Sequence, residues 1–194
     1  DASRGLGDVY KRQLLGLANS LSGFFILIFA PFLGALADIT FKKKYMLVFF
    51  MLIGTGSTAS FFFIYEGYWM IAVIAYILAS IGFSGGNIFY DSLIIDVSND
   101  QSRNQVSAFG YAMGYLGGGI LFVVNVLMYL QPNIFGLASE IDAVLFSFLS
   151  VAIWWSIFTL PLIKFVKERK GEITSHSLTS TCLLYTSPSP RDAS

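Results

Sequence analysis

Five long apolar segments constrain this chain more than any other feature of its sequence. They cover Leu14–Ala37, Tyr45–Tyr65, Trp69 to about Ile95, Val106–Leu130 and Ala143–Phe165. Each is longer than the ~20 residues that a helix needs to cross ~30 Å of hydrocarbon. A helix satisfies its own backbone hydrogen bonds in lipid, and these runs lack the alternating polar positions of a barrel strand. The sequence therefore predicts an all-α membrane protein with five transmembrane helices.

The composition excludes an ordinary soluble domain and narrows the class of function. The chain is 55% hydrophobic and 12% charged, whereas soluble domains carry about 25% charged residues. The sequence contains no metal-ligand spacing, phosphate-binding loop or nucleophile arrangement, and its single histidine and single cysteine fall outside the apolar segments. We therefore expect a lipid bilayer as partner, and neither enzyme activity, nor a cofactor or metal, nor a nucleic-acid partner.

The two ends of the chain differ in character from the rest. Residues 3–13 read SRGLGDVYKRQ and residues 182–192 read CLLYTSPSPRD. One DNA sequence that encodes the second peptide encodes the first on its opposite strand, which is typical of a sequencing adapter and not of two natural soluble tails. We interpret residues 1–13 and 182–194 as translated adapter. Residues 14–170 are then a partial N-terminal transmembrane bundle, and residues 171–181 begin a cytoplasmic linker.

Basic residues gather on one side of the predicted membrane. Eight occur between the two adapter peptides, all at that side: Lys42, Lys43, Lys44, Arg103, Lys164, Lys167, Arg169 and Lys170. The opposite loops, around Glu66 and from Gln131 to Asp142, contain none. The positive-inside rule makes the lysine loop cytoplasmic. The first segment then starts outside, so we expect one further helix upstream, which makes six.

The loop after the first segment joins an acid to three lysines. Gly34 would let the helix end pack closely against a neighbour, and Asp38 could face the positive end of another helix. The loop lysines could pair with acids on adjacent helices, and Asp96 at the cytoplasmic end of the third segment is the natural partner. We interpret Gly34, Asp38, Lys42, Lys43 and Asp96 as a cytoplasmic gate that holds one conformation. The alternative is an ordinary positive-inside loop.

The third segment carries a polar stripe. Its members are spaced by three or four residues: Tyr76, Ser80, Ser84, Asn87 and Asp91. At about 100° per residue they fall within an arc of roughly 80°, so we expect them to line a water-filled cavity or to face a buried partner. Asn19 could face the same cavity, or lie near the outer end of the first segment. An acid within a membrane indicates function, although Asp91 could instead be wet and structural near the cytoplasmic surface.

Glycines repeat strictly in the fourth segment. Gly110, Gly114 and Gly118 are four residues apart, which gives a double small-x-x-x-small pattern. Such a pattern predicts a face on which another helix packs closely. A structural packing role is the preferred interpretation, because no feature of the repeat points to a ligand.

Several strings resemble one family of membrane carriers. They are GLANS (16–20), PFLGALAD (31–38), ASIGF (79–83), FYDSLIIDV (89–97), GYAMGYLGGG (110–119), PNIFGL (132–137) and SFLSVAIWW (147–155). Together with the acid and lysines of the loop, they resemble the vacuolar effluxer family of the major facilitator superfamily. Two departures are Ile95, where the family usually has proline, and Arg103-Asn104, where it usually has an Asp-Arg pair.

The resemblance implies a twelve-helix carrier built from two bundles that works by alternating access. The five segments would be helices two to six, and the C-terminal bundle would be missing. The substrate would be a small metabolite such as an amino acid, with Asp91 as a candidate carrier of a coupling proton. The membrane would be the plasma (bacterial inner) or vacuolar membrane. A non-transporting membrane scaffold or sensor on the same fold is the alternative function.

Overall fold

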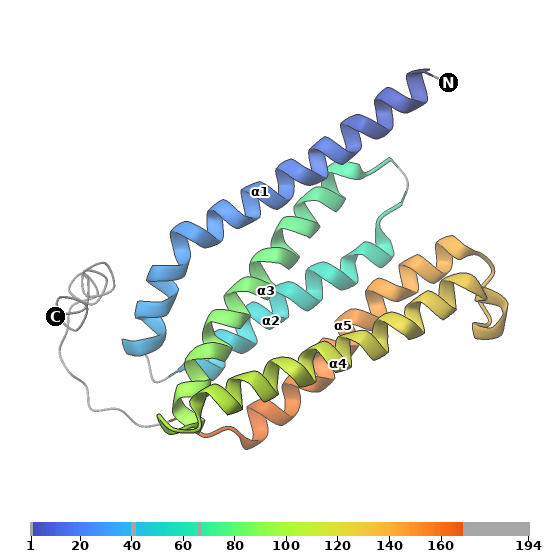
Figure 1. Cartoon of the computed structure of the whole chain (residues 1–194). Helices are drawn as coiled ribbons and strands as arrows, with labels where there is room; N and C mark the ends of the chain where they lie inside the picture. The colour runs from blue at the N-terminus through green and yellow to red at the C-terminus, as the bar shows by residue number, and fades with distance from the viewer. Residues whose placement is uncertain (1, 40–41, 66, 169–194) are drawn as a thin grey trace.

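The computed structural model describes residues 2–39, 42–65 and 67–168, with the backbone alone for residues 2–11, 38 and 39. These residues form five α-helices and two short 3-10 helices (Figure 1). The α-helices are α1 (Ala2–Ile39), α2 (Lys43–Ser60), α3 (Trp69–Val97), α4 (Arg103–Leu130) and α5 (Glu140–Phe165), and the 3-10 helices are η1 (Phe61–Phe63) and η2 (Pro132–Phe135). All five α-helices are long and apolar enough to cross a membrane. The predicted all-α membrane fold with five spans is thus confirmed, while the predicted linker and C-terminal adapter lie outside the described residues.

The helix ends differ from the predicted boundaries by a few residues, except at the start of the chain. α1 begins at Ala2 instead of Leu14. α5 begins at Glu140 because the Ser139 hydroxyl caps it, accepting a hydrogen bond from the Asp142 backbone N–H at 3.1 Å. Glu140 and Asp142 also lie at the positive pole of this helix, which favours acids. In α5, therefore, apolarity marks the part of the helix within hydrocarbon, whereas the cap residue Ser139 marks where the helix begins.

α3 is packed mainly against α2, and also against α1 (Figure 1). Glycines make the first contact possible, because a Cβ at Gly82 would meet the backbone of Gly54, and one at Gly85 would meet the Phe50 ring. The Trp155 ring of α5 occupies the space where a Cβ of Gly54 would lie. Three helices therefore meet at the Gly54 backbone, and their positions are fixed by close contact.

The hydrophobic core lies near the lysine-bearing end, where α1, α2 and α3 converge. Its buried members are Ala37, Leu47, Phe89 and Leu93, and Phe50 and Tyr90 pack against them. By contrast, α4 packs mainly on α5 and buries only Met128. Most of the surface of α4 is thus apolar and uncovered by the described helices, as expected for a face that meets lipid or another bundle.

Candidate functional site

An ion pair joins the lysine loop to the end of α3. Lys43 Nζ donates to both carboxylate oxygens of Asp96, at 3.1 and 3.2 Å, and to the Ser92 carbonyl oxygen at 3.4 Å. The two side chains are 14% and 7% exposed, so solvent screens their attraction less than it screens a surface pair. The structure thus places Asp96 against one of the loop lysines.

Lys43 and Asp96 each lie at the unfavourable pole of a helix. Lys43 is the first residue of α2, where free backbone N–H groups carry partial positive charge. Asp96 is one residue from the end of α3, where free carbonyl groups carry partial negative charge. Because α2 begins where α3 ends, the two side chains meet. Each charge offsets the unfavourable field that the other experiences, so neither is well placed alone.

A second set of contacts joins α2 to α5 and was not predicted from the sequence. Lys44 Nζ donates to the carbonyl oxygens of Val166 at 2.7 Å and Ile163 at 3.3 Å. Glu168 accepts a hydrogen bond from the Lys44 backbone N–H at 2.7 Å. The Lys44 ammonium thus lies at the negative end of α5, and the Glu168 carboxylate lies at the positive end of α2. Each satisfies backbone groups that a helix end leaves free. Sequence reasoning missed Glu168 because it is an acid in a positively charged tail, and nothing local indicates its partner.

The remaining residues of the predicted gate make fewer contacts. Lys42 is the exposed N-cap residue of α2, and its side chain bonds no acid within the described residues. A Cβ at Gly34 would meet nothing within 4 Å; the close approach predicted there occurs instead at Ala35 and Ala37, which are fully buried. Asp38 lies on α1, but its side chain lies outside the described residues.

The predicted polar stripe lies on the less buried side of α3. α3 buries a face of small and apolar residues: Ala75, Gly82, Gly85, Gly86, Phe89, Leu93 and Ile94. The stripe is half-buried at Tyr76, Ser80, Ser84 and Asn87 and exposed at Asp91. The centres of the two faces are roughly 150° apart at 100° per residue. The stripe is therefore placed to face a cavity or a further helix, and the water-filled cavity stays a prediction.

Each end of the stripe contacts a neighbouring helix. The Tyr76 hydroxyl donates to Asn19 Oδ1 of α1 at 3.2 Å, and the Tyr111 hydroxyl of α4 donates to Asp91 Oδ1 at 3.0 Å. Asn19 is a residue that the sequence assigned either to the same cavity or to the outer end of the first segment. The sequence did not indicate Tyr111 as a site residue, because Tyr111 lies within the glycine-rich segment, whose pattern indicates helix packing alone.

The glycine repeat of α4 meets another described helix at one of its three positions. A Cβ at Gly110 would meet the hydroxyl of Tyr90 on α3, so a side chain there would displace that ring. A Cβ at Gly114 or Gly118 would meet nothing within 4 Å. The described helices thus do not provide the packing partner that the repeat predicts at residues 114 and 118. The pattern marks a face on which a helix can approach but does not identify that helix.

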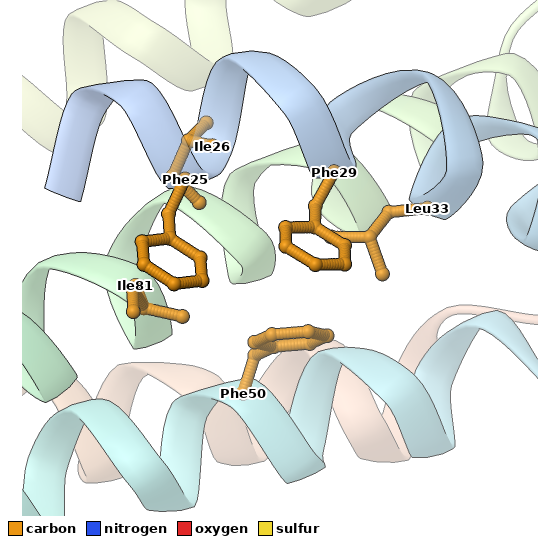
Figure 2. A pocket seen from close by; sticks show the side chains of 6 residues that line it. All are labelled: Phe25, Ile26, Phe29, Leu33, Phe50 and Ile81. Atoms are coloured by element: carbon orange, nitrogen blue, oxygen red, sulfur yellow. The ribbon is translucent and has the colours of Figure 1, made fainter. Parts of the chain in front are cut away.

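A recess of about 290 Å³ lies between α1, α2 and α3. Figure 2 shows its apolar lining, which consists of Phe25, Ile26, Phe29, Leu33, Phe50 and Ile81. None of the stripe residues lines it, so the recess is separate from the predicted path and offers no polar group to a substrate. Within residues 2–39, 42–65 and 67–168, no three His, Cys, Asp or Glu side chains are grouped to hold a metal ion.

Comparisons with known proteins identify the family of this chain. The family model described as "Vacuole effluxer Atg22 like" matches residues 14–97 and 94–186. The chain belongs to this family. It is also 34% identical over 169 residues to a protein of Bacillus subtilis (strain 168) named "Uncharacterized MFS-type transporter YxiO". That match covers 87% of the chain but 40% of the relative, and no solved structure matches. The predicted resemblance to an effluxer family of facilitator-type transporters is confirmed.

Proposed function

We propose that this chain forms helices two to six of a secondary transporter, which moves a small metabolite across a membrane by alternating access. The polar stripe carries the proposal, because five polar side chains follow the less buried side of α3 while its other face is packed. Membership of the effluxer family and the five apolar spans support it. An amino acid is the proposed substrate, and the lysine loop is proposed to lie in the cytoplasm.

The lysine-bearing end is the proposed cytoplasmic gate. Lys43 and Asp96 are paired there, and Lys42 is exposed beside them. Gly34 and Asp38 belong to the same end of α1. The stripe residues Tyr76, Ser80, Ser84, Asn87 and Asp91 are the proposed substrate path. Asp91 is the proposed carrier of a coupling proton, because an acid inside a membrane span is costly without a role.

Flux through liposomes tests the proposal. The complete gene product that contains this chain is reconstituted, and uptake of labelled amino acids is measured with and without a proton gradient, using a trapped pH-sensitive dye to follow protons. We expect substrate-dependent flux, and we expect Asp91→Asn to abolish its coupling to protons. Asp100→Asn, which changes an exposed loop acid paired with Arg103, is the matched control. Coupling unchanged by Asp91→Asn removes Asp91 from the mechanism, and flux absent from the unaltered protein favours the scaffold or sensor.

A further inference from the structure

Asp91 and two tyrosines form a cluster between α3 and α4. The Tyr111 hydroxyl donates to Asp91 Oδ1 at 3.0 Å. The rings of Tyr90 and Tyr111 meet edge to face, with centroids 6.2 Å apart and an angle of 88° between their planes. Gly110 makes room for this arrangement, because a Cβ there would meet the Tyr90 hydroxyl. The cluster thus combines one carboxylate with two aromatic rings inside two membrane spans.

Asp91 is isolated from positive charge. Within the five spans that the structure describes, it is the one charged residue more than a helical turn from a span end. The ion pairs among the described residues use other acids, Asp96 and Asp100. The Tyr111 hydroxyl occupies one of the roughly four lone-pair positions of the carboxylate. A membrane-embedded carboxylate with so little compensation favours the arrival of a cation.

We propose that Asp91, Tyr90 and Tyr111 bind the primary ammonium group of the substrate. This inference rests on the proposed transport function and names what this part of the protein recognises. An ammonium group offers three donors and a positive charge, so it can bond the carboxylate while lying against an aromatic ring. A substrate carboxylate meets no cation along these spans away from their ends. The substrate carboxylate is therefore expected to be bound by another part of the protein.

Three compounds that share the leucine side chain test the site. They are leucine, 3-methylbutylamine, which lacks the carboxylate, and 4-methylpentanoate, which lacks the amine. The measurement is the concentration of each that half-maximally raises the melting temperature of the complete gene product, purified in detergent without any ion gradient. We expect leucine and the amine to bind and the acid not to bind. Asp91→Asn should raise the half-maximal concentration of the amine roughly tenfold to hundredfold, as loss of a charge-assisted hydrogen bond does.

Two further variants keep the test independent of folding defects. Tyr111→Phe retains the ring and removes the hydroxyl, so it should weaken amine binding less than Asp91→Asn does. Asp100→Asn should leave binding unchanged. The ammonium site is overturned if neither amine-bearing compound binds, if the acid binds as well as leucine, or if Asp91→Asn binds the amine as tightly as the unaltered protein.

The same proteins in liposomes separate this inference from the proposed function. Amine binding that depends on Asp91, together with an absence of flux, upholds the site and overturns transport. Substrate-dependent flux, together with amine binding that Asp91→Asn leaves unchanged, upholds transport and overturns the site.

Discussion

Replacing Gly82 by alanine should push α2 and α3 apart. The added Cβ would meet the backbone N and Cα of Gly54 and approach the Phe50 carbonyl oxygen. These are backbone atoms within a helix, so they cannot rotate away as a side chain can. Gly54 itself has little freedom to retreat, because the Trp155 ring fills the space beside it. The clash is therefore relieved by movement of whole helices.

The cost follows from the contacts that such a movement weakens. Separating two packed surfaces by roughly 0.5–1 Å forfeits a quarter to a half of the dispersion energy of each contact between them. Overpacking in a close-packed core costs about 1–3 kcal/mol. Because α2 and α3 form the most extensive helix contact of the fold, we expect Gly82→Ala to lower the free energy of unfolding by about 2–3 kcal/mol.

Two other glycines of α3 provide the controls. Gly86 is also buried, yet a Cβ there would meet nothing within 4 Å, so Gly86→Ala should leave stability unchanged. Gly85→Ala should be intermediate, because its clash is with the Phe50 ring, which can rotate. Thermal unfolding of the purified protein, followed by tryptophan fluorescence, ranks the three. Equal melting temperatures for Gly82→Ala and Gly86→Ala would refute the reasoning.

Further predictions concern the helix ends. Lys43→Met should lower the free energy of unfolding by about 3 kcal/mol because it leaves Asp96 nearly buried and unpaired; adding Asp96→Asn should restore part of this loss in thermal unfolding, and a purely additive loss would contradict the pairing. Lys44→Met should lower the melting temperature more than Lys42→Met does, because Lys44 bonds two carbonyls of α5 while Lys42 is exposed; equal values would argue against the contact. Ser139→Ala should cost about 1 kcal/mol through loss of the N-cap and should speed amide exchange in the first turn of α5; unchanged exchange there would show that the cap does not hold this helix end.

The five spans could be predicted because the membrane imposes a length and a polarity that each segment displays by itself. The separation of polar and packed faces on α3 could be predicted for the same reason, since the helical period separates the stripe from the glycine face. The cavity itself stays a prediction. The helices that pack against these faces could not be predicted from the sequence. The backbones of α2 and α3 meet at Gly54, yet this residue is one of many glycines, and only the folded chain brings Gly82 against it.

The charged end shows the same limit. Asp96 was predictable as a partner because it is an acid at the end of a span, on the side where the lysines lie. The choice of Lys43 over Lys42 depends on which way each side chain leaves the start of α2. The contact between Lys44 and the end of α5 joins residues that are 119 and 122 positions apart in the sequence. Neither the choice of Lys43 nor the contact of Lys44 with α5 can be predicted from the neighbouring residues in the sequence.

These contacts also restrict how a gate at this end could work. Lys43 and Asp96 join α2 to α3, whose backbones already touch at Gly54 and Gly82. Lys44 joins α2 to α5, so the three helices are held together as one body. A latch must connect two bodies that move apart, and a pair inside one body cannot do so. We therefore expect the contact that changes to be made by Lys42, which is exposed and bonds no acid within the described residues, with a part of the protein outside the described helices. On this argument Lys43 and Asp96 orient the cluster, and Lys42→Met should alter transport while leaving the melting temperature unchanged.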